Sequence, residues 1–116
     1  MNIKTISFYW TASGKCPVEE HLDSLSDEQA TKIAWVLKLI RELDQVPLKY
    51  FKKLVNTNDI WEVRVVVGGN TFRLLGFFDG PALIILTNSF QKKSRKIPVK
   101  QIRLAEKRKR DYLRMR

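Results

Sequence analysis

Apolar and polar residues alternate with two different periods along the chain. Residues 2–10 are rich in β-branched and aromatic side chains and predict a first strand. Residues 17–25 predict a short helix that begins with a proline and has two glutamates in its first turn. A longer helix is predicted from Ser26 to about Asp44, because Ser26 and Gln29 can form a capping box before apolar residues recur at helical spacing.

Three further strand-like runs follow residues 45–59, which are interpreted as a linker. The runs are joined by Gly-Gly-Asn and Asp-Gly-Pro, both typical turn sequences, and predict a three-stranded antiparallel meander. Residues 98–116 predict a basic C-terminal helix with an apolar face. The expected fold is α+β in the order β-α-α-β-β-β-α, with two N-terminal helices packed on an antiparallel sheet. Residues 1–116 are expected to form a single domain.

The positive charge is confined to the last quarter of the chain. Residues 1–87 contain ten Lys or Arg and ten Asp or Glu, whereas residues 88–116 contain twelve basic residues and two acidic ones. This segment therefore carries the whole net charge of +10 and favours a polyanionic partner. Apolar residues interrupt the basic ones throughout the segment, which indicates folded structure rather than a solvated tail.

Several chemistries lack the residues that they need. The chain has one cysteine, Cys16, and one histidine, His21, which is interpreted as a surface residue of an acidic helix. We therefore expect no disulfide framework, no metal site and no cofactor. No apolar run approaches the ~20 residues that span a bilayer, and the N-terminus lacks the features of a signal peptide, so a cytoplasmic protein is expected.

The candidate chemistry is cationic. Strand alternation turns Glu62, Arg64 and Arg73 away from the core, and hairpin pairing can set the two arginines side by side. The third strand of the meander then delivers Lys92 and Lys93 to the same rim. With Arg73 on an open face, its truncation should cost the fold at most about 1 kcal/mol. Alternation is equally consistent with arginines that only pair with acidic neighbours at the surface.

Such a face has the groups needed to cleave RNA without histidine or metal, because the RNA 2′-OH is itself the nucleophile. Arginines can grip the scissile phosphate and stabilise its developing charge. A lysine crowded by Arg64 and Arg73 would have a lowered pKa and could move protons. Phe90 or Tyr112, expected to be exposed, could stack a base. The same residues would also serve simple RNA binding.

Five segments in a fixed order resemble the HigB-type, phage-derived branch of the RelE/ParE toxin superfamily. They are YW…SGKCPVEEHLDSL, FKKL, IWEVRV, TFRLLGFFDG and IILTNSFQKKSRKIPVKQIRLAEKRKRDY. The similarity extends from about Tyr9 to Tyr112. It implies a RelE-like fold and a type II toxin that is a ribosome-dependent, metal-independent mRNA endonuclease. It also implies a cognate antitoxin, here expected to be of helix-turn-helix type and encoded in the adjacent reading frame.

The resemblance assigns catalytic roles to Arg73, Arg64, Lys92 and Lys93, with Arg73 as the best match to a phosphate-gripping arginine. Glu62 occupies a strand position where RelE itself has a lysine, and acidic residues there suit the HigB-like branch. The candidates for contacts with RNA are Phe90, Arg95, Lys96, Arg103, Lys107, Arg110 and Tyr112.

Two other functions share most of these features. ParE-like toxins have the same fold but act on DNA gyrase, and the Lys-Lys-spacer-Pro segment favours the nuclease over this alternative. A basic RNA-binding module without catalytic activity would account for the charge but not for cations gathered on one sheet face.

Overall fold

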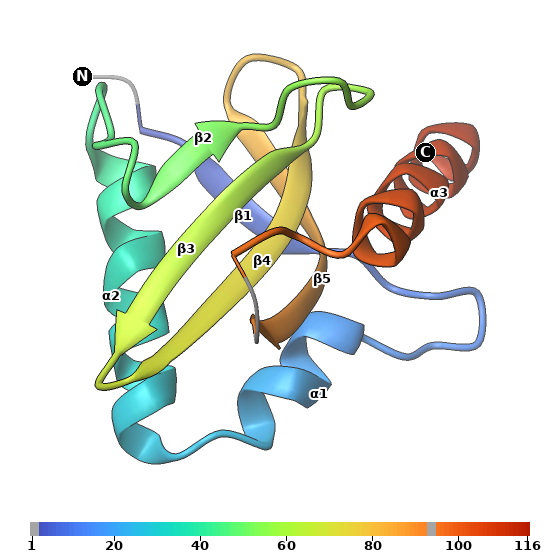
Figure 1. Cartoon of the computed structure of the whole chain (residues 1–116). Coiled ribbons are helices and arrows are strands. Elements are labelled where there is room, and N and C mark those ends of the chain that lie inside the picture. Colours follow the sequence, from blue (N-terminus) through green and yellow to red (C-terminus); the bar gives the residue numbers. More distant parts are fainter. Residues whose placement is uncertain (1–2, 93–94) are drawn as a thin grey trace.

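A computed structural model describes residues 3–92 and 95–116 and has three layers (Figure 1). A five-stranded sheet, in the order β1-β5-β4-β3-β2, lies between α1 and α2 on one face and α3 on the other. The strands are β1 (Thr5–Phe8), β2 (Phe51–Lys53), β3 (Trp61–Val67), β4 (Asn70–Asp79) and β5 (Leu83–Lys92), and the helices are α1 (Pro17–Asp23), α2 (Asp27–Glu42) and α3 (Val99–Met115).

The α+β class and the RelE-like fold are confirmed, with two differences in the sheet. The interval interpreted as a linker contains β2, which pairs antiparallel with β3, so the order becomes β-α-α-β-β-β-β-α. The first strand pairs with β5 in parallel, so the sheet is mostly rather than wholly antiparallel. Across residues 3–92 and 95–116, no helix has the length and apolar character to cross a membrane.

Local signals account for the position of α2 and of the β3–β4 hairpin. The Ser26 hydroxyl accepts a hydrogen bond from the Gln29 amide, and the Gln29 side chain accepts one from the Ser26 amide, so the capping box forms as expected. A two-residue turn joins β3 to β4, and Gly68 adopts a φ of 60° there, which favours glycine.

The main core lies between the sheet and the two N-terminal helices. Its fully buried side chains include Ile33, Val36 and Ile40 of α2, which contact Val65 and Phe72 of the central strands. Smaller apolar clusters occupy the opposite face, where α3 packs. They are centred on Phe77 and Ile85, and on Ile60, Leu75 and Ala105. Both faces of the central strands are therefore covered over much of their length.

A bulge interrupts the pairing of β4 with β5. Leu75 pairs with Asn88 and Gly76 pairs with Leu86, so Thr87 is the extra residue in β5. The Thr87 hydroxyl lies 3.1 Å from the Leu75 carbonyl oxygen and 2.6 Å from the Asn88 side-chain oxygen, and both can accept its one proton. At this point the two backbones approach so closely that a Cβ on Gly76 would lie 2.3 Å from the Ile85 carbonyl oxygen.

We expect Gly76→Ala to lower the free energy of unfolding by about 1–3 kcal/mol, the usual cost of overpacking. The added methyl group would force the two strands apart. Gly69→Ala is the matched control, since no atom lies within 4 Å of the Cβ it would add. Urea denaturation of both variants measures the difference. Equal stability of the two variants would contradict the close approach at the bulge.

Candidate active site on the cationic sheet face

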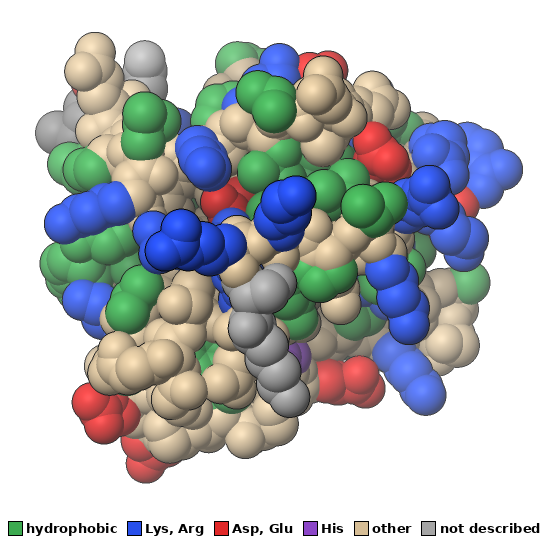
Figure 2. All heavy atoms as spheres, viewed as in Figure 1, with side chains coloured by type: hydrophobic (Ala, Val, Ile, Leu, Met, Phe, Trp, Pro, Cys, Tyr) green, Lys and Arg blue, Asp and Glu red, His purple; other side chains and the backbone are tan. Residues whose placement is uncertain are grey.

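Four basic side chains come together on the α3-side face of the sheet. Strand pairing sets Arg64 directly opposite Arg73, and it places Lys92 opposite Thr71, two residues from Arg73 along β4. Lys52 of β2 lies opposite Glu62 on the same face. We call Lys52, Arg64, Arg73 and Lys92 the cationic cluster. Figure 2 shows basic side chains gathered over this face and along α3.

Arg73 is the buried member of the cluster. Its guanidinium forms an ion pair with the Glu62 carboxylate, and the two residues are 7% and 1% exposed. The expectation that Arg73 and Glu62 lie on an open surface is therefore wrong. They face the side predicted from alternation, but the segment before β3 and the start of α3 add a second layer there. Within the described residues, Nε of Arg73 has no hydrogen-bond partner.

Lys52, Arg64 and Lys92 are the accessible members, and Lys52 is exposed on β2. Arg64 is exposed on β3, and Lys92 is half-buried at the end of β5, where its amine donates a hydrogen bond to the Arg95 carbonyl. Partial burial lowers the pKa of Lys92, and the positive charges of Arg73, Arg64, Lys52 and Arg95 lower it further. The cluster therefore contains an amine whose neutral form is more accessible than that of an isolated lysine.

The remaining catalytic candidate, Lys93, lies outside the described residues. Phe90 lies opposite Arg73 in β5 and is half-buried, because it packs against the cluster of Ile60, Leu75 and Ala105. It borders the cationic cluster but presents only part of its ring to solvent.

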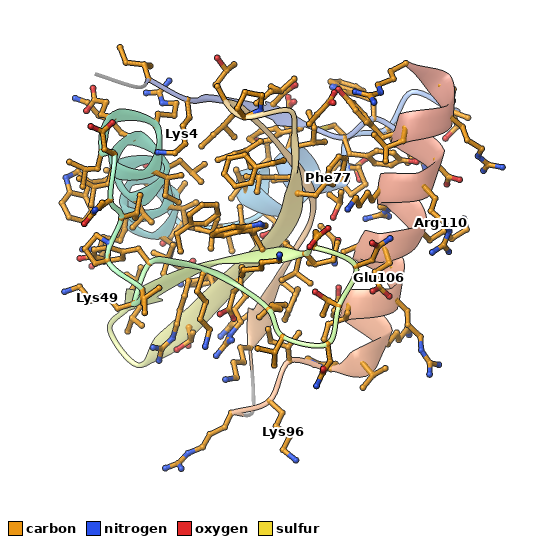
Figure 3. The ribbon with its side chains drawn as sticks, turned by 90° about the horizontal axis from the view of Figure 1, so that it is seen from above. Lys4, Lys49, Phe77, Lys96, Glu106 and Arg110 are labelled. Atoms are coloured by element: carbon orange, nitrogen blue, oxygen red, sulfur yellow. The ribbon has the colours of Figure 1, made fainter. Side chains whose placement is uncertain are left out.

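The other candidates for RNA contact lie in two places. Arg95 and Lys96 are exposed in the segment before α3, and Arg103, Lys107 and Arg110 are exposed on α3 itself. Figure 3 shows Arg110 pointing away from the sheet, whereas Phe77 points from β4 toward α3. The outer side of α3 therefore adds positive charge beside the cationic cluster without joining it.

Tyr112 is not an exposed stacking surface. Its ring packs edge-on against Phe77, with 5.5 Å between ring centroids, and its hydroxyl donates a 2.8 Å hydrogen bond to Asp79. This hydrogen bond raises the pKa of Tyr112. Asp79 also pairs with Arg116. Tyr112 thus anchors the end of α3 to β4, away from the cationic cluster.

Polar contacts also fix α3 against the bulge. The Asn88 side-chain amide donates hydrogen bonds to the carbonyl and the side chain of Gln101. The Arg108 guanidinium donates one of 2.8 Å to the Thr87 carbonyl, and burial lowers its pKa. Sequence patterns did not indicate these contacts, because they depend on the irregular pairing of β5.

His21 lies on the other face of the sheet. The prediction that it is a surface residue is wrong. It is half-buried, and its Nδ1 lies 2.6 Å from the Ser89 hydroxyl. Burial lowers the pKa of the imidazole. Cys16 is buried at the N-cap position of α1. Over the described part of the chain, no cluster of three or more His, Cys, Asp or Glu side chains could hold a metal ion.

The arrangement of strands and helices is that of RelE-like proteins, a class defined by a small, mostly antiparallel sheet with helices on both faces. The model of the family described as "Phage derived protein Gp49-like (DUF891)" matches residues 20–110. The chain belongs to this Gp49-like family, which is part of the RelE/HigB-type toxin group. No curated protein matches the chain. Membership of a toxin family implies a cognate antitoxin.

Proposed function

We propose that this protein is the toxin of a type II toxin–antitoxin system and that it stops translation by cleaving mRNA on the ribosome. The observation that carries the proposal is the position of Lys92, whose amine with lowered pKa lies beside the opposed pair Arg64 and Arg73. A cation pair next to a proton acceptor is the set of groups that RNA cleavage needs.

In the proposed reaction the RNA supplies its own nucleophile. The neutral amine of Lys92 accepts the proton of the 2′-OH as the 2′-oxygen attacks the adjacent phosphorus. Arg64 and Arg73 stabilise the negative charge that develops on the phosphate oxygens. The bond to the 5′-oxygen breaks, water protonates that oxygen, and the products are a 2′,3′-cyclic phosphate and a free 5′-OH. No metal ion takes part.

Glu62 has a positioning role in this proposal. Its buried carboxylate holds one edge of the Arg73 guanidinium, so that the cation stays next to Arg64 although the two repel each other. The Arg73 Nε–H is buried and has no acceptor among the described residues, so Arg73 would act on the phosphate through its charge. Exposed cations before and along α3, such as Lys96 and Arg103, would hold the RNA backbone by charge.

Induced expression is expected to stop growth and to leave mRNAs cleaved at translated positions. Primer extension on RNA from the arrested cells locates the cleavage sites, and chemical analysis of the new ends identifies a cyclic phosphate. Intact mRNA together with inhibited supercoiling by gyrase would instead assign the protein to the gyrase-directed mode of ParE toxins. RNA binding without cleavage would leave only the basic binding module.

A further inference from the structure

The outer edge of β1 has free hydrogen-bonding groups. The Thr5 amide donates to the Ala82 carbonyl and the Tyr9 amide donates to the Leu86 carbonyl, so alternate residues of β1 face β5. The amides and carbonyls of Ile6 and Phe8 therefore point away from the sheet. No described residue hydrogen-bonds to them, whereas the preceding amide, that of Lys4, donates to a carbonyl of α2.

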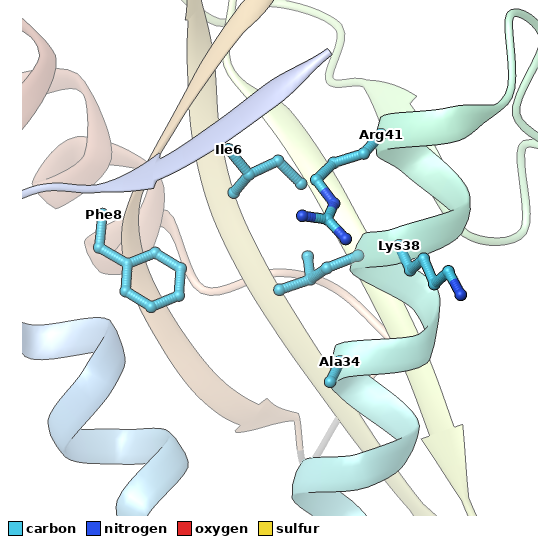
Figure 4. Close-up of a pocket in the computed structure, with 6 residues that line it drawn as sticks. Ile6, Phe8, Ala34, Lys38 and Arg41 are labelled. Carbon is cyan, nitrogen blue, oxygen red and sulfur yellow. The ribbon is translucent and has the colours of Figure 1, made fainter. Parts of the chain in front are cut away.

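Hollows lie on both sides of this edge. On the α2 side, a hollow of about 260 Å³ is lined mainly by Ile6, Phe8, Leu37 and Arg41 (Figure 4). It continues into a second hollow of about 350 Å³ that shares Ile6 and Arg41. On the α3 side, a hollow of about 300 Å³ lies beside the same strand. An added strand would thus find room for the side chains that it directs to either face.

The lining of the hollows indicates the chemistry of the occupant. The first hollow on the α2 side has an apolar floor, and the cations Lys38 and Arg41 lie at its border. Glu42 lines the adjoining hollow, but neither cation forms an ion pair among the described residues. On the α3 side, Trp10 and Met115 are 57% and 74% exposed. The edge therefore suits an extended segment with apolar side chains on both faces and acidic side chains near Lys38 and Arg41.

We propose that the β1 edge binds an extended, acidic and apolar segment of the cognate antitoxin as a sixth strand of the sheet. Backbone hydrogen bonds to Ile6 and Phe8 would supply affinity, and the hollows would supply selectivity. A second copy of this chain suits the edge less well, because it would bring Lys38 and Arg41 against the same cations. The proposal rests on the antitoxin of the proposed function but not on RNA cleavage.

Amide hydrogen exchange followed by NMR tests the proposal on the full-length protein. In the free protein, the amides of Ile6 and Phe8 should exchange fast and those of Thr5, Ser7 and Tyr9 slowly, because only the latter face β5. Addition of the antitoxin encoded beside this chain should slow exchange at Ile6 and Phe8 at least tenfold. A complex in which these two amides still exchange fast would overturn the proposal.

Charge reversal provides an independent test of the acidic segment. Arg41→Glu should weaken antitoxin binding by about tenfold and reduce its salt dependence. Lys32→Glu is the matched control, because it makes the same charge change on α2 at a residue that does not line the hollow. Equal affinities of the two variants would remove the acidic segment from the proposal. Exchange that slows with protein concentration alone would assign the edge to a second copy.

A failure of this proposal can be distinguished from a failure of the proposed function. If the protein cleaves mRNA but its antitoxin leaves Ile6 and Phe8 unprotected, only the docking site is wrong. If the antitoxin protects both amides but no RNA is cleaved, the docking site stands without the nuclease.

Discussion

Replacing Arg73 with alanine should lower the free energy of unfolding by about 3–5 kcal/mol, as the loss of one partner from a buried ion pair does. The loss comes mainly from Glu62, which is 1% exposed and would keep a buried carboxylate without its counter-ion. This effect exceeds the limit of about 1 kcal/mol expected for an exposed arginine. Urea denaturation at neutral pH measures it.

Arg64→Ala is the matched control, because it removes the same side chain from the opposed position of the pair. Arg64 is exposed, so its loss should change stability by less than about 1 kcal/mol. The double variant Glu62→Leu with Arg73→Met should recover most of the stability, since it removes both charges together. Equal stabilities of Arg73→Ala and Arg64→Ala would show that the ion pair is not buried in solution.

Lys92→Ala should slow RNA cleavage by roughly 10²–10⁴-fold, the range for loss of a positioned acid or base. Stability should change little, because Lys92 is a partly exposed residue at the end of β5. Single-turnover cleavage on programmed ribosomes measures the rate. Ribosome affinity, measured in parallel, should fall much less than the rate, since the cations before and along α3 remain.

The pH dependence identifies the role of Lys92. A base acts in its neutral form, so the wild-type rate should rise with pH and level off near the pKa of Lys92, which burial and four neighbouring cations lower from the usual ~10.4. Lys92→Arg keeps the positive charge but cannot lose its proton, so its slow rate should not rise with pH over this range. A Lys92→Arg variant with the wild-type pH profile would exclude Lys92 as the base.

The sequence predicted the elements that depend on nearby residues. The capping box located the start of α2, and the Gly-Gly-Asn turn located the hairpin that sets Arg64 opposite Arg73. The apolar face of α3 was also correct, since Ala105 is buried against the sheet. The parallel pairing of β1 with β5 was not predicted, because residues about 78 apart in the chain meet there and no local pattern encodes such a contact.

The sequence predicted the face of the sheet on which the candidate site lies, but not how far its residues are buried. Alternation gives the face to which a side chain points, and it placed Arg73 and Glu62 on the correct one. It does not reveal a second layer over that face, where Ile60, before β3, and Ala105 of α3 pack with Leu75 of β4. Lys52 was missed as a site residue because β2 has three residues, too few for a period to be recognised.

The bulge at Thr87 has a consequence for the cationic cluster. Leu86 points to the α2 side, so strict alternation from Leu86 would send Phe90 and Lys92 to that side too. The extra residue reverses the alternation, and both side chains reach the α3 side instead. Deletion of Thr87 would therefore conserve every cation of the chain and still remove the amine from the phosphate site. One extra residue in β5 thus decides on which face of the sheet every later side chain of the strand lies.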